Sequence, residues 1–505
     1  MHIVRLLLQT TAYDEQVIDK RFHAVSHIHN VLVKHAKKLL VQLKHHREYQ
    51  ILLCEYVALS KKEKLSQVEK FRQKSLSKAM SDIRISIGLS EYAFQFYIKK
   101  CAKQFSKCLS SQQVQKEATR VWKGVESVLF GNGKNIHFKK YEDFTTICGK
   151  TNTNGVKFDK NTLSIEWIGL NICCKHPKKD KDVSYLLESL DHNISYCEIE
   201  RKMFPNGWHY YVLVYLKDNA PCKLKEIGTD TMGIDPGTST VAGVSEKKVV
   251  LRELAPDCQK YNRQIQKLLR RMDLSRRAGN PRKYNPDGTI NKHNHEKWVY
   301  SNTYVKNKRK LKSLYRQKSA YIKQSHEQLC NELLTDSVNF VIENMTYSSL
   351  QRRTKNTERS SVPTNIKQKD GSAKQVFKYK KKKRFGRSLN NRAPAMFLTI
   401  LKRKCTECGG KYVEIDTKKF RASQYNHVTN EYSKIPLSQR EKDVGGYSVQ
   451  RDLYSAFLIR NSNNNLTAPD RDKCVYEFEN FTRMQNELIE DMKKRNITMR
   501  QCFGF

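Results

Sequence analysis

The stretch Thr231–Val244 reads TMGIDPGTSTVAGV and decides the fold of the second half of the chain. Its first residues, up to Ile234, are typical of a buried strand, which ends on the acidic residue Asp235. The Pro-Gly pair that follows predicts a turn, and the apolar run after it predicts a returning strand. The sequence therefore indicates a sheet with a carboxylate at the end of one strand.

Two later stretches place a carboxylate in a comparable position. Val338–Met345 (VNFVIENM) is an apolar run that ends on Glu343, as a buried strand would. Tyr447–Ile459 (YSVQRDLYSAFLI) predicts that Asp452 opens a helix whose apolar residues pack on a sheet. Singly, each acid would be interpreted as a cap or a solvated residue. Together, in suitable elements, they predict one shared site.

Carboxylates are the hard oxygen ligands that Mg²⁺ prefers. Three of them can hold two ions roughly 3.5–4 Å apart, one activating a water and one stabilising a leaving oxygen. We therefore predict that Asp235, Glu343 and Asp452 are both the catalytic residues and the ligands of two Mg²⁺ ions. The sequence indicates no organic cofactor.

The charge of the chain predicts a polyanionic partner. Its 505 residues include 94 Lys and Arg against 51 Asp and Glu, a net charge of +43. These cations are spread over the whole length, which favours a long nucleic acid as the partner. No long uncharged apolar run predicts a membrane span, and the first ten residues do not resemble a secretory signal. The 14 scattered cysteines favour reduced thiols. We expect a cytoplasmic, nucleoid-associated protein of a prokaryote, with no membrane partner.

The apolar patterns predict an α+β, multidomain chain. A strand is expected in residues 1–12, and a basic helical domain in 13–134, where apolar residues recur every three or four positions. Short strands, with a hairpin at Pro205–Gly207, predict a β-barrel or sandwich over 135–228. We expect an α/β domain over 229–463, with a helical insertion at about 252–335, and a helical tail over 464–505.

The three acidic segments resemble the split RuvC nuclease of the TnpB family, the transposon-encoded RNA-guided nucleases, and of type V CRISPR effectors. The GIDPG segment is similar to the first RuvC motif, VIENM to the second and RDLYSAFLI to the third. The resemblance implies an RNase H-like fold for 229–463, a helical recognition domain for 13–134 and a wedge β-barrel for 135–228, to which residues 1–12 contribute the first strand. It covers most of the chain in architecture, but only about 40 residues in motif.

The resemblance implies an RNA-guided DNA endonuclease. The implied partners are a guide RNA and a double-stranded target DNA with a short flanking motif. Whether the guide comes from a transposon end or a CRISPR array stays open, as does whether one chain or two bind each RNA. Two alternatives also stay open: an RNA-guided DNA-binding protein without cleavage, and an RNA-independent resolvase or integrase of the RuvC type.

The chain departs from the family pattern at two places. Relatives commonly carry a zinc ribbon of two Cys-x-x-Cys pairs, but the matching segment, about 420–446, has no cysteine. Cys405 and Cys408 lie before it, and even with His427 they would supply too few ligands, so we expect no zinc. Tyr454 and Ser455 follow Asp452 where the family usually has Asn-Ala.

A basic and aromatic segment is the predicted nucleic-acid contact. Residues 351–392 are polar and predict a flexible or ligand-ordered stretch, in which cations meet phosphates and aromatic rings stack on bases. The residues assigned to this contact are Lys374, Lys378, Tyr379, Lys380, Lys382, Arg384, Phe385 and Arg387. The aromatic residues Tyr92, Phe94, Phe96 and Tyr97 are interpreted as core and receive no functional role.

Overall fold

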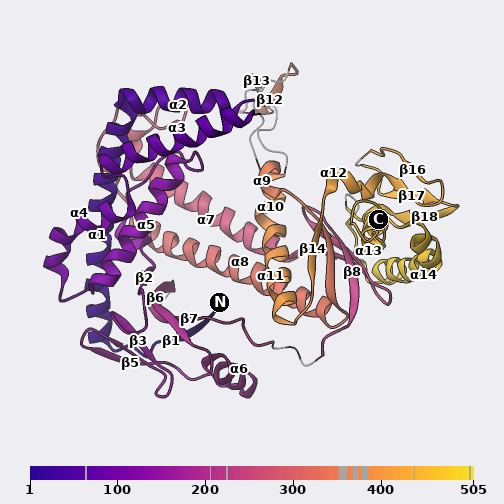
Figure 1. Ribbon diagram of the computed structural model, residues 1–505, viewed down its shortest axis with the longest axis horizontal. Helices are drawn as coiled ribbons and strands as arrows, with labels where there is room; N and C mark the ends of the chain where they lie inside the picture. The colour runs from indigo at the N-terminus through magenta and orange to yellow at the C-terminus, as the bar shows by residue number, and fades with distance from the viewer. Residues whose placement is uncertain are drawn as a thin grey trace. The chain divides into compact units, whose positions relative to one another are not determined.

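The computed structural model describes residues 1–62, 65–204, 206–222, 224, 226–351, 361–367, 373–377, 385–436, 438–499 and 502–505. It divides into two compact units, Met1–Pro221 and Cys222–Phe505 (Figure 1). Helices and several separate sheets occur together, so the prediction of a mixed α+β chain is confirmed. No helix among the described residues has the length and apolar character needed to cross a membrane.

The first unit is mainly helical up to residue 129. Its helices are α1 (Ala12–His45), α2 (Arg47–Ser60), α3 (Gln67–Ser86), α4 (Glu91–Ala102), η1 (Lys103–Phe105), α5 (Ser111–Leu129), η2 (Tyr141–Asp143) and α6 (Asp180–Leu190). Side chains of serine and threonine cap several of them, as at Thr11, whose hydroxyl accepts a hydrogen bond from the backbone of Asp14. Helices α1 to α5 lie between residues 12 and 129, within the stretch where apolar residues recur every three or four positions.

The strands of this unit form two open sheets. They are β1 (His2–Leu7), β2 (Thr146–Cys148), β3 (Val156–Asp159), β4 (Ser164–Trp167), β5 (Leu170–Cys173), β6 (Ile194–Phe204) and β7 (Gly207–Leu216). One sheet has the order β1-β7-β6-β2 and the other β3-β4-β5, all antiparallel. A barrel needs a continuous hydrogen-bond ladder around the ring. Here a single bridge, Leu8 to Cys174, joins the sheets within the described chain, so the predicted closed barrel is not confirmed.

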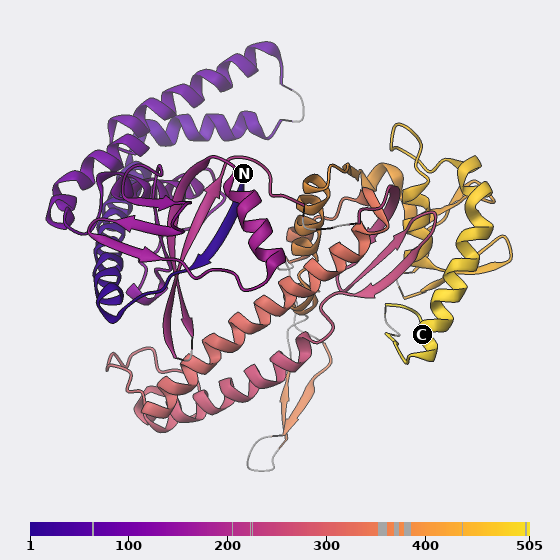
Figure 2. The same ribbon diagram turned by 90° about the horizontal axis from the view of Figure 1, so that it is seen from below.

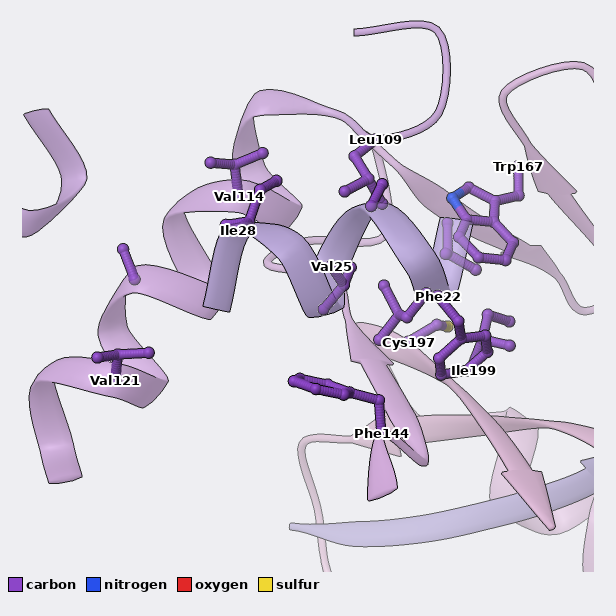
Figure 3. Close-up of a cluster of buried hydrophobic side chains, with 14 of the residues drawn as sticks. Phe22, Val25, Ile28, Leu109, Val114, Val121, Phe144, Trp167, Cys197 and Ile199 are labelled. Atoms are coloured by element: carbon purple, nitrogen blue, oxygen red, sulfur yellow. The ribbon is translucent and has the colours of Figure 1, made fainter. Parts of the chain in front are cut away.

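One core holds the helices and sheets of the first unit together. Phe22, Val25 and Ile28 form a stripe on α1, and Val114 and Val121 face them from α5 (Figure 3). Side chains from the sheets, among them Trp167 and Ile199, complete the cluster. Burying such side chains supplies most of the stability of a unit of this kind.

The second unit is built on a five-stranded mixed sheet. Its strands are β8 (Asp230–Pro236), β9 (Thr240–Val244), β10 (Val249–Glu253), β11 (Ser337–Glu343) and β14 (Tyr412–Ile415). Their order across the sheet is β10-β9-β8-β11-β14. The first three strands are antiparallel neighbours, whereas β11 and β14 run parallel to β8. The Pro-Gly turn predicted after Asp235 is the link between β8 and β9.

Helices cover both faces of this sheet. On one face, α8 (Asn302–Leu334) and α11 (Pro394–Glu407) pack on a cluster that includes Met232, Ile234, Phe340 and Ile342. On the other face, α13 (Arg451–Arg460) and α14 (Arg471–Lys494) pack against the alternate residues of the strands. The sheet is therefore enclosed between two layers of helices.

The remaining elements connect these layers. Helix α7 (Cys258–Ala278) runs beside α8 as a long pair in the helical insertion (Figure 2). The others are η3 (Pro281–Lys283), α9 (Tyr347–Leu350), β12 (Thr364–Lys367), β13 (Ala373–Val376), α10 (Gly386–Arg392), α12 (Thr417–Phe420), η4 (Ala422–Gln424), β15 (Tyr425–Asn426), β16 (Glu431–Tyr432), β17 (Glu441–Val444) and β18 (Tyr447–Gln450).

Candidate active site

The two central strands carry two of the predicted acids to the same edge of the sheet. Asp235 lies next to the end of β8 and Glu343 is the last residue of β11. These strands are parallel, with Ile342 paired to Ile234, so the two acids that follow are neighbours. The parallel pairing of β8 and β11 therefore places Asp235 beside Glu343.

The alternation of a strand puts both carboxylates on one face. Ile234 and Ile342 belong to the core between the sheet and α11. Because successive side chains point to opposite faces, Asp235 and Glu343 face the α13 side. Val341, two residues before Glu343, packs against the core of that side and supports the assignment.

Helix α13 supplies the third acid from above this face. Asp452 is in its first turn, and the side chain of Gln450 caps the helix by accepting a hydrogen bond of 2.8 Å from the backbone of Leu453. The helix approaches the sheet closely at Gly233, where an added Cβ would lie 2.3 Å from the carbonyl oxygen of Ala456. A glycine two residues before Asp235 thus allows the helix that carries Asp452 to pack on the strand that carries Asp235.

The three acids influence one another electrostatically. Burial raises the pKa of Asp235 well above its usual range, and the negative charges of Glu343 and Asp452 raise it further. Burial also raises the pKa of Glu343, while hydrogen bonds from Thr417 and Asp235 lower it. The three carboxylates therefore concentrate negative charge at one place in the second unit.

Two arginines partly offset this charge. Nη1 of Arg440 lies 3.4 Å from Oδ2 of Asp452, and the positive charges of Arg440 and Arg451 lower the pKa of Asp452, which burial raises overall. Sequence analysis missed both arginines. Arg451 precedes Asp452 directly and could have been considered, whereas Arg440 lies in a stretch without apolar periodicity.

The donor set suits a hard divalent cation, because all three side chains offer carboxylate oxygens and their mutual repulsion would be relieved by a positive ion. Across the described ranges, however, no group of three or more His, Cys, Asp or Glu side chains is gathered closely enough to hold a metal ion. In the structure, the carboxylate of Asp452 contacts the guanidinium of Arg440.

The predicted nucleic-acid segment can be followed only in part. Lys378, Tyr379, Lys380, Lys382 and Arg384 lie outside the described residues. Lys374 lies on β13 and Arg387 on α10, and Phe385 is the half-buried residue before α10. Their contact with nucleic acid stays a prediction.

Residues of the segment at about 420–446 pack on aromatic side chains of α13 and α14. His427 is buried, and its Nδ1 lies 2.8 Å from the hydroxyl of Tyr454. Tyr454 and Phe457 of α13 and Phe478 of α14 therefore pack together beside His427.

The two cysteines considered for zinc have other partners. Cys405 is buried and its thiol donates to the carbonyl of Val338 over 3.2 Å. Sγ of Cys408 lies 2.8 Å from Sγ of Cys222.

The chain is similar to solved structures but matches no curated protein by sequence. No protein-family profile and no curated protein matches the chain. Among solved structures, the chain is similar to one titled a cryo-EM structure of the Cas12f1-sgRNA-target DNA complex, with 12% identity and a TM-score of 0.41 over 91% of this chain and 98% of that one. It is also similar to a CRISPR-Cas12f ternary complex, with 10% identity and a TM-score of 0.29 over 91% and 99%. Sequence identities and TM-scores this low are no basis for assigning a function to the chain.

Proposed function

We propose that the chain is an RNA-guided DNA endonuclease that hydrolyses phosphodiester bonds at Asp235, Glu343 and Asp452. The observation that carries the proposal is that β8, β11 and α13 bring these acids near enough for the charges of Glu343 and Asp452 to raise the pKa of Asp235. The sheet with helices on both faces supports it, because the resemblance implies an α/β nuclease fold of the RNase H type. Two features of the sequence support the dependence on a guide RNA: the net charge of +43, and the motifs that resemble those of the TnpB family and of type V CRISPR effectors.

In this mechanism Asp235, Glu343 and Asp452 are the residues that would hold two Mg²⁺ ions. Such ions, when bound, supply an activated water and stabilise the leaving oxygen. The protein supplies the positioning: adjacent parallel strands orient Asp235 and Glu343, and the capped start of α13 orients Asp452. The guanidinium of Arg440, held beside Asp452, offers a positive charge to an approaching phosphate.

The first experiment is to purify the full chain from cells that carry its native locus and to sequence the RNA that co-purifies. One abundant RNA with a constant scaffold and a variable end supports the guided function, and its source separates a transposon end from a CRISPR array. A heterogeneous mixture, or no RNA, contradicts it and favours a resolvase acting on DNA structure.

The second experiment tests the acids in the RNA-loaded protein, with a target DNA library of random flanks. We expect cleavage in Mg²⁺ and none in EDTA. Asp235→Ala and Asp452→Ala should abolish cleavage and leave guide-dependent binding largely intact. The matched control is Asp472→Ala, an exposed acid in the first turn of α14, which should cleave normally. Guided binding without cleavage by the wild type would instead identify an RNA-guided binding protein.

A further inference from the structure

Helix α4 of the first unit carries aromatic side chains on two different faces. Phe94 is buried and its ring centroid lies 5.7 Å from that of Trp122, while Tyr97 stacks on His35 at 3.6 Å. By contrast, Tyr92 is 85% and Phe96 is 72% exposed. Tyr97 is 45% exposed as well, so the interpretation of all four residues as core is wrong for Tyr92, Phe96 and Tyr97.

The exposed rings of Tyr92 and Phe96 border a groove of about 680 Å³ on the helical part of the unit. The groove is lined by residues of α4, η1 and α5 and of the link between them. Leu109 and Val114 are buried residues of its lining, and Tyr92 and Phe96 are exposed ones. Tyr92 and Phe96 are four residues apart on the helix, so their Cβ atoms are neighbours about 5–6 Å apart. The surface is thus a pair of adjacent rings beside an apolar groove.

The surroundings of the groove are positively charged. Residues 91–107 contain four lysines and one acid, Glu91, which gives a net charge of 4 − 1 = +3. The carboxylate of Glu91 already accepts hydrogen bonds from Gln95 and Thr119. Lys99 and Lys103 line the groove itself, and the ammonium of Lys99 lies 5.1 Å from the centre of the Phe96 ring.

We propose that this groove binds unpaired nucleotides, with a base stacked on Phe96 or Tyr92 and the neighbouring phosphates beside Lys99 and Lys103. Aromatic rings that accept bases, combined with cations that follow the backbone, are how proteins bind single strands without reading sequence. A second copy of this chain fits less well, because it would bring two groups of lysines against each other. The proposal rests on the nucleic-acid binding in the proposed function, but not on cleavage.

The test uses the full-length protein in EDTA, so that cleavage plays no part, and a fluorescein-labelled oligouridine of about 15 nucleotides as the probe. We expect Phe96→Ala to weaken binding about tenfold by fluorescence anisotropy. Phe96→Trp, which keeps an aromatic face, should retain the wild-type affinity. The matched control is Phe71→Ala, a 77% exposed phenylalanine on α3 that does not line the groove, which should bind as the wild type does.

A second readout reports stacking directly. An oligonucleotide that contains 2-aminopurine should lose fluorescence on binding the wild type and should keep it with Phe96→Ala. Because Phe96 is largely exposed, the variant should fold normally, which circular dichroism verifies.

Three other results would contradict the proposal, and each would identify a different cause. Equal affinity of Phe96→Ala and Phe71→Ala would exclude the groove while leaving nucleic-acid binding intact. Failure of the wild type to bind the probe would contradict the nucleic-acid premise as well. If Phe96→Ala changed the sedimentation coefficient from dimer to monomer but left oligonucleotide binding unchanged, the occupant of the groove would be a second copy of the chain.

Discussion

The guanidinium of Arg440 contacts the carboxylate of Asp452, with Nη1 of the arginine 3.4 Å from Oδ2 of the aspartate. Both side chains are largely buried, at 23% and 18% exposed, and Nε of Arg440 is buried without a hydrogen-bond partner in the described structure. The arginine therefore offsets part of the negative charge of Asp452, and a Mg²⁺ ion bound by this carboxylate would compete with Arg440.

This competition predicts that Arg440→Gln binds Mg²⁺ more tightly than the wild type does. A partly exposed ion pair is worth up to about 1 kcal/mol, so its removal should lower the apparent dissociation constant by about two- to fivefold. The measurement is the Mg²⁺ concentration that gives half of the maximal rise in Tm, without nucleic acid. The control is Arg483→Gln, which breaks the exposed ion pair with Glu487 on α14 and should leave the Mg²⁺ dissociation constant unchanged. Weaker Mg²⁺ binding by Arg440→Gln would show that the arginine assists the ion.

A second prediction concerns the repulsion among the acids. The pKa of Asp235 is raised in the folded protein from its ordinary value of 3.8. The native state therefore holds this proton at pH values where the unfolded chain has released it, so the contribution of Asp235 to stability falls as the pH rises. In EDTA, Asp235→Asn should have a higher Tm than the wild type, and the difference should be larger at pH 8 than at pH 5.

The size of this effect can be measured by thermal unfolding. About 1 kcal/mol shifts the Tm of a unit of this size by roughly 2–4 °C. Asp472→Asn, on the exposed start of α14, is the control for loss of a negative charge elsewhere. If the Tm difference between Asp235→Asn and the wild type were the same at both pH values, the pKa of Asp235 would not be raised in the folded protein.

The close packing at Gly233 gives a third prediction. A Cβ at this position would lie 2.3 Å from the backbone of both Ala456 and Arg460, so α13 would have to move away from β8. Gly233→Ala should destabilise the protein by about 1–3 kcal/mol and slow cleavage, because Asp452 moves with the helix. The control is Gly243→Ala on β9, whose Cβ would meet the flexible side chain of Met232 at 3.0 Å. Equal behaviour of the two variants in urea unfolding and in cleavage would contradict this account.

The elements that carry the acids could be predicted from the sequence because each has a strong local signal. The residues before Asp235 and the Pro-Gly turn after it indicate that β8 ends close to Asp235, and the apolar residues after Asp452 indicate a packed helix. That the acids share one face also follows from the period of a strand. The contact of Arg440 with Asp452 has no such signal, because it depends on how a loop returns to the start of α13.

Local sequence patterns could not predict which strands pair when they lie far apart in the sequence. Whether short strands close into a barrel depends on hydrogen bonds such as the single bridge between Leu8 and Cys174, which are far apart in the sequence. In the same way, α4 is apolar on both faces, and spacing alone does not tell which face meets Trp122 and which is left exposed at Phe96.

Buried His427 provides the last prediction. It is 1% exposed, and the groups around it are the hydroxyl of Tyr454, the cations Arg471 and Lys442, and the ring of Phe478. Burial first, and then the two cations, lower its pKa from 6.5 to about 4. Between these values the unfolded chain binds a proton that the native protein does not, so stability is lost as the pH falls from about 6.5 to 4.

The loss attributable to His427 should reach about 3 kcal/mol at the acid end of this range, since one pKa unit corresponds to about 1.4 kcal/mol. His427→Gln cannot titrate. It should be less stable than the wild type at pH 7, where it replaces a well-packed imidazole, and the difference should shrink as the pH falls to 4.5. Urea unfolding at several pH values measures this, with the exposed His295→Gln of the same unit as the control. A difference that stays constant from pH 7 to 4.5 would show that His427 does not remain neutral in the folded protein.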